Sequence, residues 1–432
     1  MPKSLANFPG SYYAASAALP PPHPPLAGSA RADIGIVGGG YAGCSAALAL
    51  AERGYRVAVI EAQRVGWGQS GRNGGQALVG VACGQSKLER LLEPADARAV
   101  WDITVAGFEL LRQRIARHAI DCDWVDGHLQ VAIKPRQVVE LAEEQEALLK
   151  LGYPPTTLLG KDELGSVLAS PRYLAGLYDP TCGHLHPLRY AQGLARAANA
   201  AGAVFHENTR AMEFRHAADG VVLRTEADGV AGELHCAQLL IAGNMHSGSL
   251  APQLARKIMP VGSFIVATEP LGEARARALI GNNAAVYDLN WVVDYYRRSA
   301  DHRLLFGGRV SYSGLENFDA VPVTRQRMLR VFPQLADARI EYNWGGLIDI
   351  TMNRAPHFGR LHPNVWFVQG FSGHGLVLGG MAGALAAEAM AGRAERFDVF
   401  TRIAHRDFPG GALLRRPALM LAMLWFRLRD LL

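Results

Sequence analysis

The sequence predicts a mixed α/β fold in which a nucleotide-binding domain with a parallel sheet carries an inserted domain built on an antiparallel sheet. Two observations lead to this prediction. Short apolar strands run through glycine-rich turns into Ala-rich helices near both ends of the chain, at 34–60 and at 365–390. Between them, 260–342 alternates in the manner of antiparallel strands and is rich in aromatic residues. A chain of 432 residues is long enough for two connected domains.

The first glycine-rich turn has the spacing of a dinucleotide-binding motif. A short apolar strand at 34–37 precedes Gly38, Gly40 and Gly43, which match G-x-G-x-x-G, and 44–53 is expected to be helical. The first glycine permits the tight turn, the second lets the backbone approach a pyrophosphate, and the third lets helix and strand pack closely. The helix N-terminus then offers unpaired N–H groups to the phosphates. This Rossmann-like unit predicts a bound dinucleotide.

Two features downstream of this turn extend the expected binding site. Glu61 ends the second strand, 57–60, where a carboxylate is placed to accept hydrogen bonds from a ribose diol. The segment 64–76 then holds five glycines together with Ser70, Arg72 and Asn73. Such a loop supplies many backbone N–H donors and a guanidinium, so we expect it to wrap an anionic or flat polar ligand.

Composition is that of an ordinary globular protein, with a net charge of +5 and no basic run that predicts nucleic-acid binding. Five scattered cysteines without a C-x-x-C pair favour a reducing compartment over a disulfide framework, and no metal site is expected. No secretory signal pattern is visible, and no apolar stretch reaches the roughly 18 residues that a membrane span needs. We therefore expect a cytoplasmic protein without a membrane span.

Several segments outside the first motif have simple interpretations. Residues 1–30 form a proline-rich arm whose tyrosines are expected to dock on the body, and 88–118 is expected to be one helix. The charged helix at 136–151 is interpreted as a solvated face. The segment 176–187 is expected to be a loop, in which His184 and His186 are interpreted as structural.

Three separated motifs together resemble the D-amino-acid oxidase, glycine oxidase and sarcosine oxidase family of FAD enzymes. They are the opening strand–turn–helix unit, Gly-Trp-Gly-Gln-Ser-Gly-Arg-Asn-Gly-Gly at 66–75 and Gly-Phe-Ser-Gly-His-Gly at 370–375. They occur in the order that this family has, and the resemblance covers about 30–410. The segment Ser-Tyr-Tyr-Ala-Ala-Ser-Ala at 11–17 and the tail Leu-Trp-Phe-Arg-Leu-Arg-Asp at 424–430 are similar to those of the gamma-glutamylputrescine oxidoreductases of bacterial polyamine catabolism.

The resemblance implies a domain plan and a set of cofactor-binding residues. The FAD-binding domain, of glutathione-reductase type, would comprise 31–110, 180–260 and 345–410. The substrate domain would comprise 111–179 and 261–344, flanked by an N-terminal arm, 1–30, and a C-terminal tail helix, 411–432. The residues expected to bind FAD are Gly38, Gly40, Tyr41, Ala42, Gly43, Glu61, Ala62, Gly68, Gln69, Ser70, Gly71, Arg72, Asn73, Gly74, Gly75, Ala211, Gly243, Asn244, Gly370, Gly373, His374, Gly375 and Leu376.

The resemblance also implies the chemistry, which is oxidation of an amine C–N bond by hydride transfer to flavin N5, followed by imine hydrolysis. The expected substrate is gamma-glutamylputrescine, with peroxide as a product if oxygen accepts the electrons. No cysteine follows Cys236, where some members tether FAD, so FAD is expected to be non-covalent. No lysine follows Lys257, where some members use one to promote the reaction with oxygen, so His374 and Arg309 are the candidate catalytic residues.

The substrate wall is expected to come from aromatic and arginine residues of the inserted domain. The candidates are Tyr287, Trp291, Tyr295, Tyr296, Arg297, Arg298, Arg309 and Trp344. Two alternatives remain open. A D-amino acid or an N-methyl amino acid would need a small pocket with one arginine for its carboxylate. Alternatively, the apolar tail 417–432 would dock the protein on a membrane surface and electrons would pass to a quinone or a partner protein. The amine, the electron acceptor and the oligomeric state are not determined by the sequence.

Overall fold

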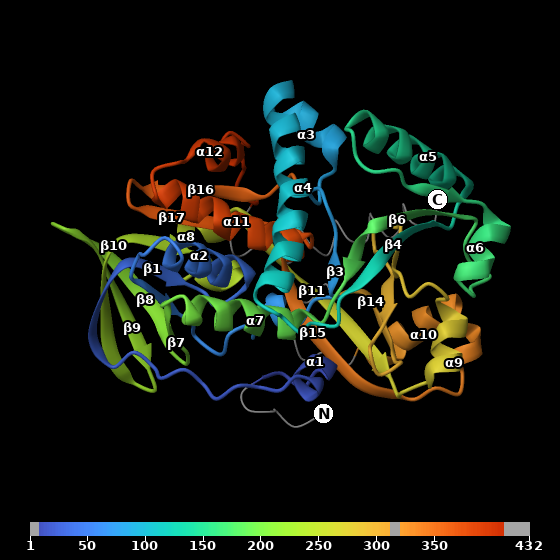
Figure 1. Ribbon diagram of the computed structural model, residues 1–432, viewed down its shortest axis with the longest axis horizontal. Coiled ribbons are helices and arrows are strands. Elements are labelled where there is room, and N and C mark those ends of the chain that lie inside the picture. Colours follow the sequence, from blue (N-terminus) through green and yellow to red (C-terminus); the bar gives the residue numbers. More distant parts are fainter. Residues whose placement is uncertain (1–7, 312–319, 410–432) are drawn as a thin grey trace.

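The computed structural model describes residues 8–311 and 320–409. For residues 309–311 it describes the backbone only. These residues form two sheets with helices around and between them (Figure 1). The first sheet lies at the left of Figure 1 and the second at the right, and the long helix α4 (Pro94–Arg117) runs between them. The expected mixed α/β class is confirmed.

The first sheet has the parallel core that the opening motif predicts. Its strands lie in the order β16-β17-β10-β1-β2-β7, with a hairpin of β8 and β9 attached to β10. The pairs β17–β10, β10–β1, β1–β2 and β2–β7 are parallel, whereas β16 is antiparallel to β17. The strand bounds are Gly28–Val37 (β1), Val57–Ile60 (β2), Val204–His206 (β7), Arg210–Ala217 (β8), Gly220–Ala227 (β9), Val230–Ile241 (β10), His357–His362 (β16) and Val365–Gln369 (β17).

The second sheet is mainly antiparallel, as the alternating middle segment predicts. Its order is β15-β11-β14-β13-β12-β4-β6-β3, with β5 paired to β6, and only β12–β4 is parallel among these pairs. The strand bounds are Gln76–Ala77 (β3), Val125–Ala132 (β4), Thr157–Leu159 (β5), Ala175–His184 (β6), Ile258–Thr268 (β11), Ala285–Asp288 (β12), Tyr295–Arg298 (β13), Leu304–Ser311 (β14) and Ile340–Thr351 (β15).

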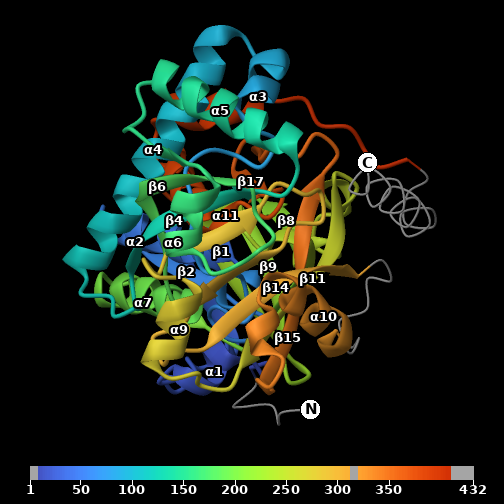
Figure 2. The same cartoon turned by 90° about the vertical axis from the view of Figure 1, so that its right-hand side faces the viewer.

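Helices cover both sheets. Figure 2 shows α5 (Pro135–Lys150) above β4 and β6, and α10 (Val321–Val331) beside β14 and β15. The remaining α-helices are Tyr12–Ser16 (α1), Tyr41–Ala51 (α2), Gln85–Leu91 (α3), Lys161–Val167 (α6), Pro187–Ala200 (α7), Pro252–Ala255 (α8), Glu273–Leu279 (α9), Gly375–Met390 (α11) and Glu395–Thr401 (α12). Short 3-10 turns occur at Gln69–Gly71, Asn244–Ser247 and Pro333–Leu335.

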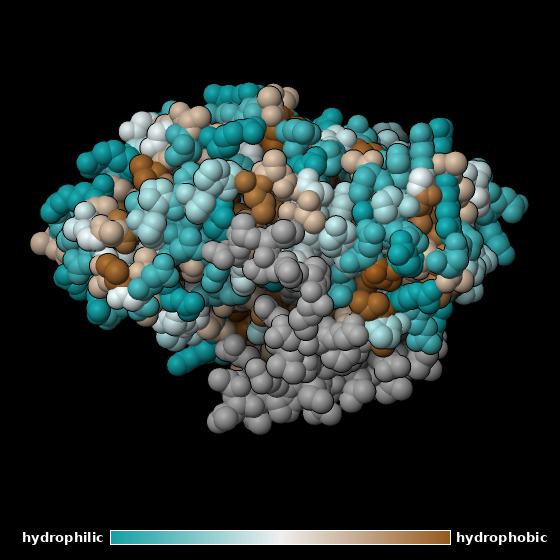
Figure 3. Space-filling model, turned by 90° about the horizontal axis from the view of Figure 1, so that it is seen from below, coloured by the Kyte–Doolittle hydropathy of each residue, from teal (hydrophilic) through white to brown (hydrophobic). Residues whose placement is uncertain are grey.

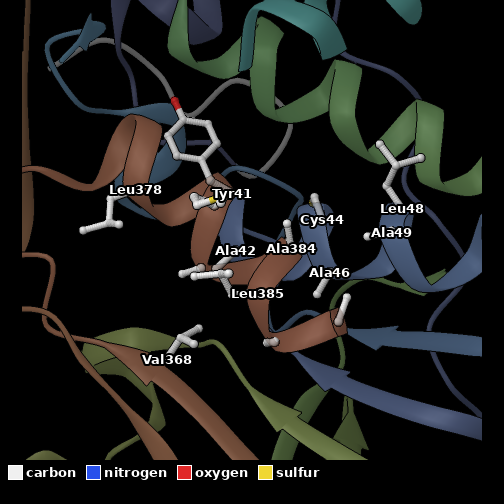
Figure 4. Packing of buried hydrophobic residues seen from close by; sticks show 14 of the residues in the cluster. Tyr41, Ala42, Cys44, Ala46, Leu48, Ala49, Val368, Leu378, Ala384 and Leu385 are labelled. Carbon is white, nitrogen blue, oxygen red and sulfur yellow. The ribbon is translucent and has the colours of Figure 1, made fainter. Parts of the chain in front are cut away.

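Helices α2 and α11 pack tightly because small residues line their contact. A Cβ on Gly383 of α11 would lie 2.1 Å from the backbone oxygen of Ala42 in α2. The Ser45 hydroxyl also donates to the carbonyl of Gly380. Figure 4 shows Ala42 and Ala46 of α2 beside Ala384 and Leu385 of α11, all within the largest hydrophobic cluster. This contact holds the starts of two helices from opposite ends of the chain close together.

The structure corrects three local expectations. The segment 88–118 is two helices, α3 and α4, because Pro94 cannot continue the preceding helix and instead begins the next one. The segment 176–187 is largely strand β6 rather than a loop, since its backbone pairs with β4. Within 260–342, where antiparallel strands are expected, residues 291–294 are not in a strand, and β13 begins only at Tyr295. The domain boundaries stay a prediction, although β15 crosses the expected boundary at 344–345 and remains in the second sheet to Thr351.

The described part of the N-terminal arm docks on the body. Tyr12 and Tyr13 are buried, and the backbone N–H of His23 donates to the buried Glu207 carboxylate at 2.8 Å. The expected tail helix, 411–432, lies outside the described residues. Seen from below, Figure 3 shows a mainly hydrophilic surface with small separate hydrophobic groups. Among the described residues, no single helix is long and apolar enough to cross a membrane. The helix pair α11 and α12 would be long and apolar enough only when taken together, and it is bent by 117°.

Candidate cofactor and substrate site

A cavity of about 1180 Å³ is lined by strands of the second sheet and by the turns and helix starts that follow strands of the first sheet. Gly40, at the start of α2, and Gly375, at the start of α11, both contribute to its wall. Ordinary ligand pockets measure about 300–1,000 Å³, so this cavity has space for a large cofactor together with a substrate. The convergence of the two glycine-rich turns is therefore a feature of the structure.

The start of α2 is built for close approach by an anion. Gly38 has φ of 107°, a conformation that side-chain-bearing residues rarely adopt. A Cβ on Gly43 would lie 1.9 Å from the Gly38 carbonyl oxygen, so only glycine lets the first turn of the helix pack on the strand end. Gly40 is the N-cap and provides no side-chain cap, although Ser70 Oγ accepts from the Tyr41 N–H at 3.0 Å. Gly40, Tyr41 and Ala42 of this first turn line the cavity.

Glu61 holds the glycine turn in place. Its Oε2 accepts from the Gly39 N–H at 2.7 Å, and its Oε1 accepts from the Gln63 N–H at 2.8 Å. Burial raises the pKa of this carboxyl, and the two backbone N–H donors oppose that rise. Each oxygen retains a second lone pair, which is what accepting from a ribose diol requires.

The glycine-rich loop after Glu61 is fixed by its own polar side chains. Asn73 donates to the Gln69 carbonyl at 2.8 Å and accepts from the Gly75 N–H at 2.8 Å. Arg72 lies over the Trp67 ring at 4.5 Å and donates to the Gly345 carbonyl at 3.1 Å. The loop therefore presents a preformed surface to the cavity rather than a flexible one.

The start of α11 is anchored by Asp349 at the end of β15. Its Oδ2 accepts from the N–H groups of Gly370 and Phe371, the latter at 2.8 Å. Desolvation of this fully buried carboxyl raises its pKa to about 6, against the effect of the donors that surround it. The anchored turn brings the backbone of Gly373, with φ of 91°, into the cavity wall beside the first turn of α11.

These features fit a dinucleotide cofactor with a flat polar ring. Two helix N-termini without side-chain caps, α2 and α11, meet at one cavity, and glycines keep the backbone approachable at both. Asn244 lies on the same wall, and its Oδ1 is buried without a hydrogen-bond partner in the structure. A ligand with both phosphates and ring N–H groups matches this set of donors and acceptors.

Most of the residues expected to bind the cofactor lie at or directly behind this wall. Those that line the cavity are Gly40, Tyr41, Ala42, Gln69, Ser70, Arg72, Asn73, Gly74, Asn244, Gly373, His374, Gly375 and Leu376. A second set does not line the cavity but belongs to the turns and loops that shape it: Gly38, Gly43, Gly68, Gly71, Gly75, Gly243 and Gly370. Glu61, Ala62 and Ala211 lie outside the cavity wall, so their contacts with the adenosine part of the cofactor stay a prediction.

Comparison with known proteins decides the family. The family model of FAD dependent oxidoreductases (DAO) matches residues 33–389. The chain belongs to this family. It is 39% identical to gamma-glutamylputrescine oxidoreductase of Escherichia coli (strain K12) over 427 residues, which covers 99% of each protein. It is 25% identical to glycine oxidase of Geobacillus kaustophilus over 388 residues, covering 85% of this chain and 95% of that one.

Solved structures agree on the fold. Glycine oxidase from Geobacillus kaustophilus superposes with a TM-score of 0.70 at 22% identity, covering 84% of this chain and 95% of that chain. L-proline dehydrogenase from P. horikoshii gives a TM-score of 0.69 at 20% identity, covering 87% and 95%. The fold of this DAO-family enzyme is therefore shared with solved proteins that differ widely from it in sequence.

The cofactor of this DAO-family oxidoreductase is FAD, held non-covalently. The cysteines are consistent with this, because Cys44, Cys122, Cys182 and Cys236 are buried free thiols and Cys83 is half-buried. Burial raises the pKa of Cys122 to about 12 and the pKa values of Cys83 and Cys236 to about 11. Thiols that stay protonated are poor nucleophiles, so none is prepared for a covalent bond to the flavin.

On the substrate side, the structure brings only some of the expected residues to the cavity. Tyr287, Trp291 and Tyr295 line it. Tyr287 accepts from the Gln130 amide and lies against His128 at a ring distance of 4.8 Å. Tyr295 hydrogen-bonds to Ser263 at 3.1 Å, and its ring lies where a Cβ on Gly74 would be. These rings form an aromatic wall of the cavity, and Tyr295 packs directly against the glycine-rich loop.

Three expected substrate-binding residues lie elsewhere, and those expectations are corrected. Tyr296 is buried in the second hydrophobic cluster, stacked on Phe306, and donates to the Tyr173 hydroxyl at 3.0 Å. Arg298 donates to the Ile280 carbonyl at 3.1 Å. Trp344 packs against the docked arm and donates to the Arg72 carbonyl at 3.0 Å. None of the three lines the cavity, because strand alternation turns their side chains into the core.

Two more arginines were candidates for binding a substrate carboxylate. Arg297 is buried and donates to the carbonyls of Gly74 at 2.7 Å, Leu185 at 3.0 Å and Arg298 at 3.1 Å. Its guanidinium is therefore used to hold the glycine-rich loop. The backbone of Arg309 lies on β14 opposite Phe264. The side chain of Arg309 is outside the described part of the structure, so its catalytic role stays a prediction.

Several cavity residues were not anticipated from the sequence. The most informative are Arg354, which follows β15, and Glu140, Glu143 and Glu144 of α5. The three glutamates are exposed, as expected for the charged face of α5, and they line the open side of the cavity. Helical spacing of the three glutamates, together with Ala147 and Leu148 on the same face, was the available signal.

His374 occupies the expected place on the wall but is not a cation at neutral pH. Its Nε2–H donates to the Val79 carbonyl at 2.9 Å, and burial together with nearby Arg354 lowers its pKa below the ordinary value.

We expect His374→Gln to lower kcat/KM by roughly the worth of one hydrogen bond, about tenfold. The ionisations in the pH profile of flavin reduction should keep their positions. An ionisation between pH 6 and 9 that disappears in the variant would contradict this assignment.

Proposed function

We propose that this DAO-family enzyme oxidises the primary amine of gamma-glutamylputrescine. The observation that carries the proposal is the 39% identity over 99% of both chains to a relative with this named activity. The size of the cavity and its aromatic wall support an elongated substrate with an aliphatic segment. When bound, FAD accepts a hydride from the carbon that bears the amine. Water then hydrolyses the imine to gamma-glutamyl-aminobutyraldehyde and ammonia, and peroxide forms if oxygen is the electron acceptor.

The residues of the chain have modest tasks in this reaction. The aromatic wall of Tyr287, Trp291 and Tyr295 would hold the aliphatic segment and exclude water from the reacting carbon. The first turn of α11, which lines the cavity and has no side-chain cap, would supply N–H groups to stabilise the negative charge of a reduced flavin ring. No protein nucleophile is required, because the C–N single bond that becomes the imine double bond lies within the substrate.

A small amino acid is the rival substrate, because glycine oxidase is also among the relatives. Such a substrate needs a guanidinium beside the reacting carbon to hold its carboxylate. Arg297 and Arg298 are bound to backbone carbonyls instead. The use of these two guanidinium groups within the fold favours the longer amine.

The proposal is tested by anaerobic mixing of the purified holoenzyme with gamma-glutamylputrescine, free putrescine, glycine, sarcosine and D-amino acids. We expect gamma-glutamylputrescine to bleach the flavin absorbance at the lowest concentration, and air to report whether oxygen restores it. Bleaching by a D-amino acid or sarcosine without bleaching by gamma-glutamylputrescine would overturn the proposed substrate and leave the amine oxidoreductase activity intact.

Cytoplasm remains the proposed location, supported by five scattered free cysteines in the described chain. Electron transfer to a quinone or a partner protein through 417–432 concerns residues outside the described structure. Deleting 411–432 tests that alternative, because unchanged turnover with soluble acceptors and with membranes would count against a docking role for the tail.

A further inference from the structure

The proposed substrate has two chemically different ends, and only one of them reacts. One end is the primary amine that is oxidised. The other end is an α-amino-acid group with a carboxylate and an ammonium on the same carbon, separated from the amine by an amide and methylene groups. A site that selects this molecule therefore needs a cation and an anion far from the reacting carbon. This inference rests on the proposed function and adds the residues that select the substrate.

Arg354 is a cavity-lining cation without a protein partner. Its side chain makes no hydrogen bond or ion pair with any described residue, and its Nε is fully buried and unpaired. Burial lowers the pKa of Arg354, as expected for a guanidinium that has lost water without gaining a carboxylate. Its φ of 60° is also uncommon for a residue with a long side chain. A buried charge without a partner is destabilising, so such a group points to an anionic ligand.

Glu140 of α5 lies at the same place with the opposite charge. A side hollow of about 330 Å³ adjoins the main cavity, and Arg354, Glu140 and Trp291 line both spaces. Glu140 makes no hydrogen bond or ion pair with any described residue. Glu143 and Glu144 follow on the same cavity-facing side of α5. The junction of the two spaces therefore offers one guanidinium and one carboxylate, neither of which is used to hold the fold.

We propose that this junction binds the α-amino-acid end of the substrate, with Arg354 holding the carboxylate and Glu140 facing the ammonium. The planar guanidinium matches a carboxylate with two parallel hydrogen bonds. The aromatic wall then receives the methylene segment, and the primary amine extends toward the glycine-lined helix ends. Arg354 and Glu140 select the substrate and take no part in the hydride transfer.

Other arginines near the cavity do not serve this purpose. Arg72 is stacked on Trp67 and bonded to Gly345 within the glycine-rich loop. Arg136 is exposed on α5, as is Glu140, but Arg136 lines only the side hollow and not the main cavity. Among the cavity-lining arginines of the described chain, Arg354 combines burial with a side chain that has no protein partner.

The test uses the holoenzyme and four putrescine amides that differ only at the far end. The acyl groups are gamma-glutamyl, glutaryl (carboxylate only), 4-aminobutyryl (ammonium only) and butyryl (neither). We expect Arg354→Gln to raise KM by about 10–100-fold for the gamma-glutamyl and glutaryl amides, with little change for the other two. Arg354→Lys should recover part of the loss. Glu140→Gln should raise KM about 2–5-fold for the two ammonium-bearing amides.

The control is Arg393→Gln, which removes the same charge from an exposed surface residue outside the cavity and should leave all four amides unchanged. Equal loss on all four amides in Arg354→Gln, or an altered flavin spectrum or FAD content, would overturn the proposal by assigning Arg354 to the cofactor or to the fold. A variant whose KM for all four amides equals that of the wild type would overturn the proposal as well. If the wild-type enzyme bleaches with none of the amides, the proposed function fails instead, and the two failures are thereby distinguished.

Discussion

Gly43→Ala is expected to abolish retention of FAD. The added Cβ would lie 1.9 Å from the Gly38 carbonyl oxygen, far inside van der Waals contact, and that atom belongs to the backbone and cannot rotate away. Either the first turn of α2 moves off the strand or the glycine turn opens, and both displace the N–H groups that face the phosphates. We expect a loss of about 3 kcal/mol in the free energy of unfolding. FAD affinity should fall by more than 100-fold, measured by flavin content after gel filtration and by titration of the apoprotein.

Gly165→Ala is the matched control for this variant. Gly165 lies in α6, a Cβ there meets no atom within 4 Å, and its backbone has no positive φ. Alanine is also the better helix former, so we expect stability unchanged or slightly higher and full flavin content. A yellow Gly43→Ala protein with ordinary FAD affinity would contradict the packing of α2 on the first strand.

Asp349→Ala is expected to have the second largest effect. The side chain is 3% exposed and accepts the N–H groups of Gly370 and Phe371, which begin the turn before α11. Its removal leaves both donors buried without an acceptor, at about 1–3 kcal/mol each. We therefore expect the free energy of unfolding to fall by about 3–5 kcal/mol, with weaker FAD binding because the first turn of α11 loses its position. Chemical denaturation with and without FAD measures both effects.

Asp349→Asn keeps the size of the side chain but removes its ionisable group, so it tests how stability depends on pH. Burial raises the pKa of Asp349 to about 6 in the folded protein, above its ordinary value of 3.8. The carboxyl therefore favours folding most below pH 4, and this contribution is lost as the pH rises through 6. Asparagine keeps an acceptor and does not titrate. The stability of the wild type relative to Asp349→Asn should fall by about 3 kcal/mol between pH 4 and 7. A difference that is constant with pH would show that Asp349 is not buried as described.

The cofactor half of the site was predictable because its signals are local. Glycines at fixed spacing between a strand and a helix require a particular backbone path, and the same reasoning applied to Gly370–Gly375. The structure brings these two turns to one cavity. The resemblance to FAD oxidoreductases was confirmed by a family match over 33–389. The role of Asp349, which anchors the second turn, was not foreseen, because the spacing of residues does not reveal a hydrogen bond from one strand end to another loop.

The substrate half was predicted less well, because it depends on which way each side chain faces. Arg297, Arg298 and Tyr296 lie on one strand whose flanking elements bury them. A charged helix has the same sequence pattern whether its exposed face meets only water or also borders a ligand cavity. The exposure of the α5 glutamates was therefore predictable, but their place on the cavity wall was not. Arg354 carries no motif. Its importance is visible only in the absence of a partner among the described residues.

The sequence by itself determined the cofactor class, the mixed α/β architecture and the two helix ends that meet at the cavity, because short-range backbone requirements of glycine and alternating apolar residues specify them. Only the tertiary structure decided which charges are neutralised inside the protein and which remain available to a ligand. That outcome depends on how segments far apart in the sequence come together. Arg354 and Glu140, for example, line one hollow, and no local pattern encodes that arrangement.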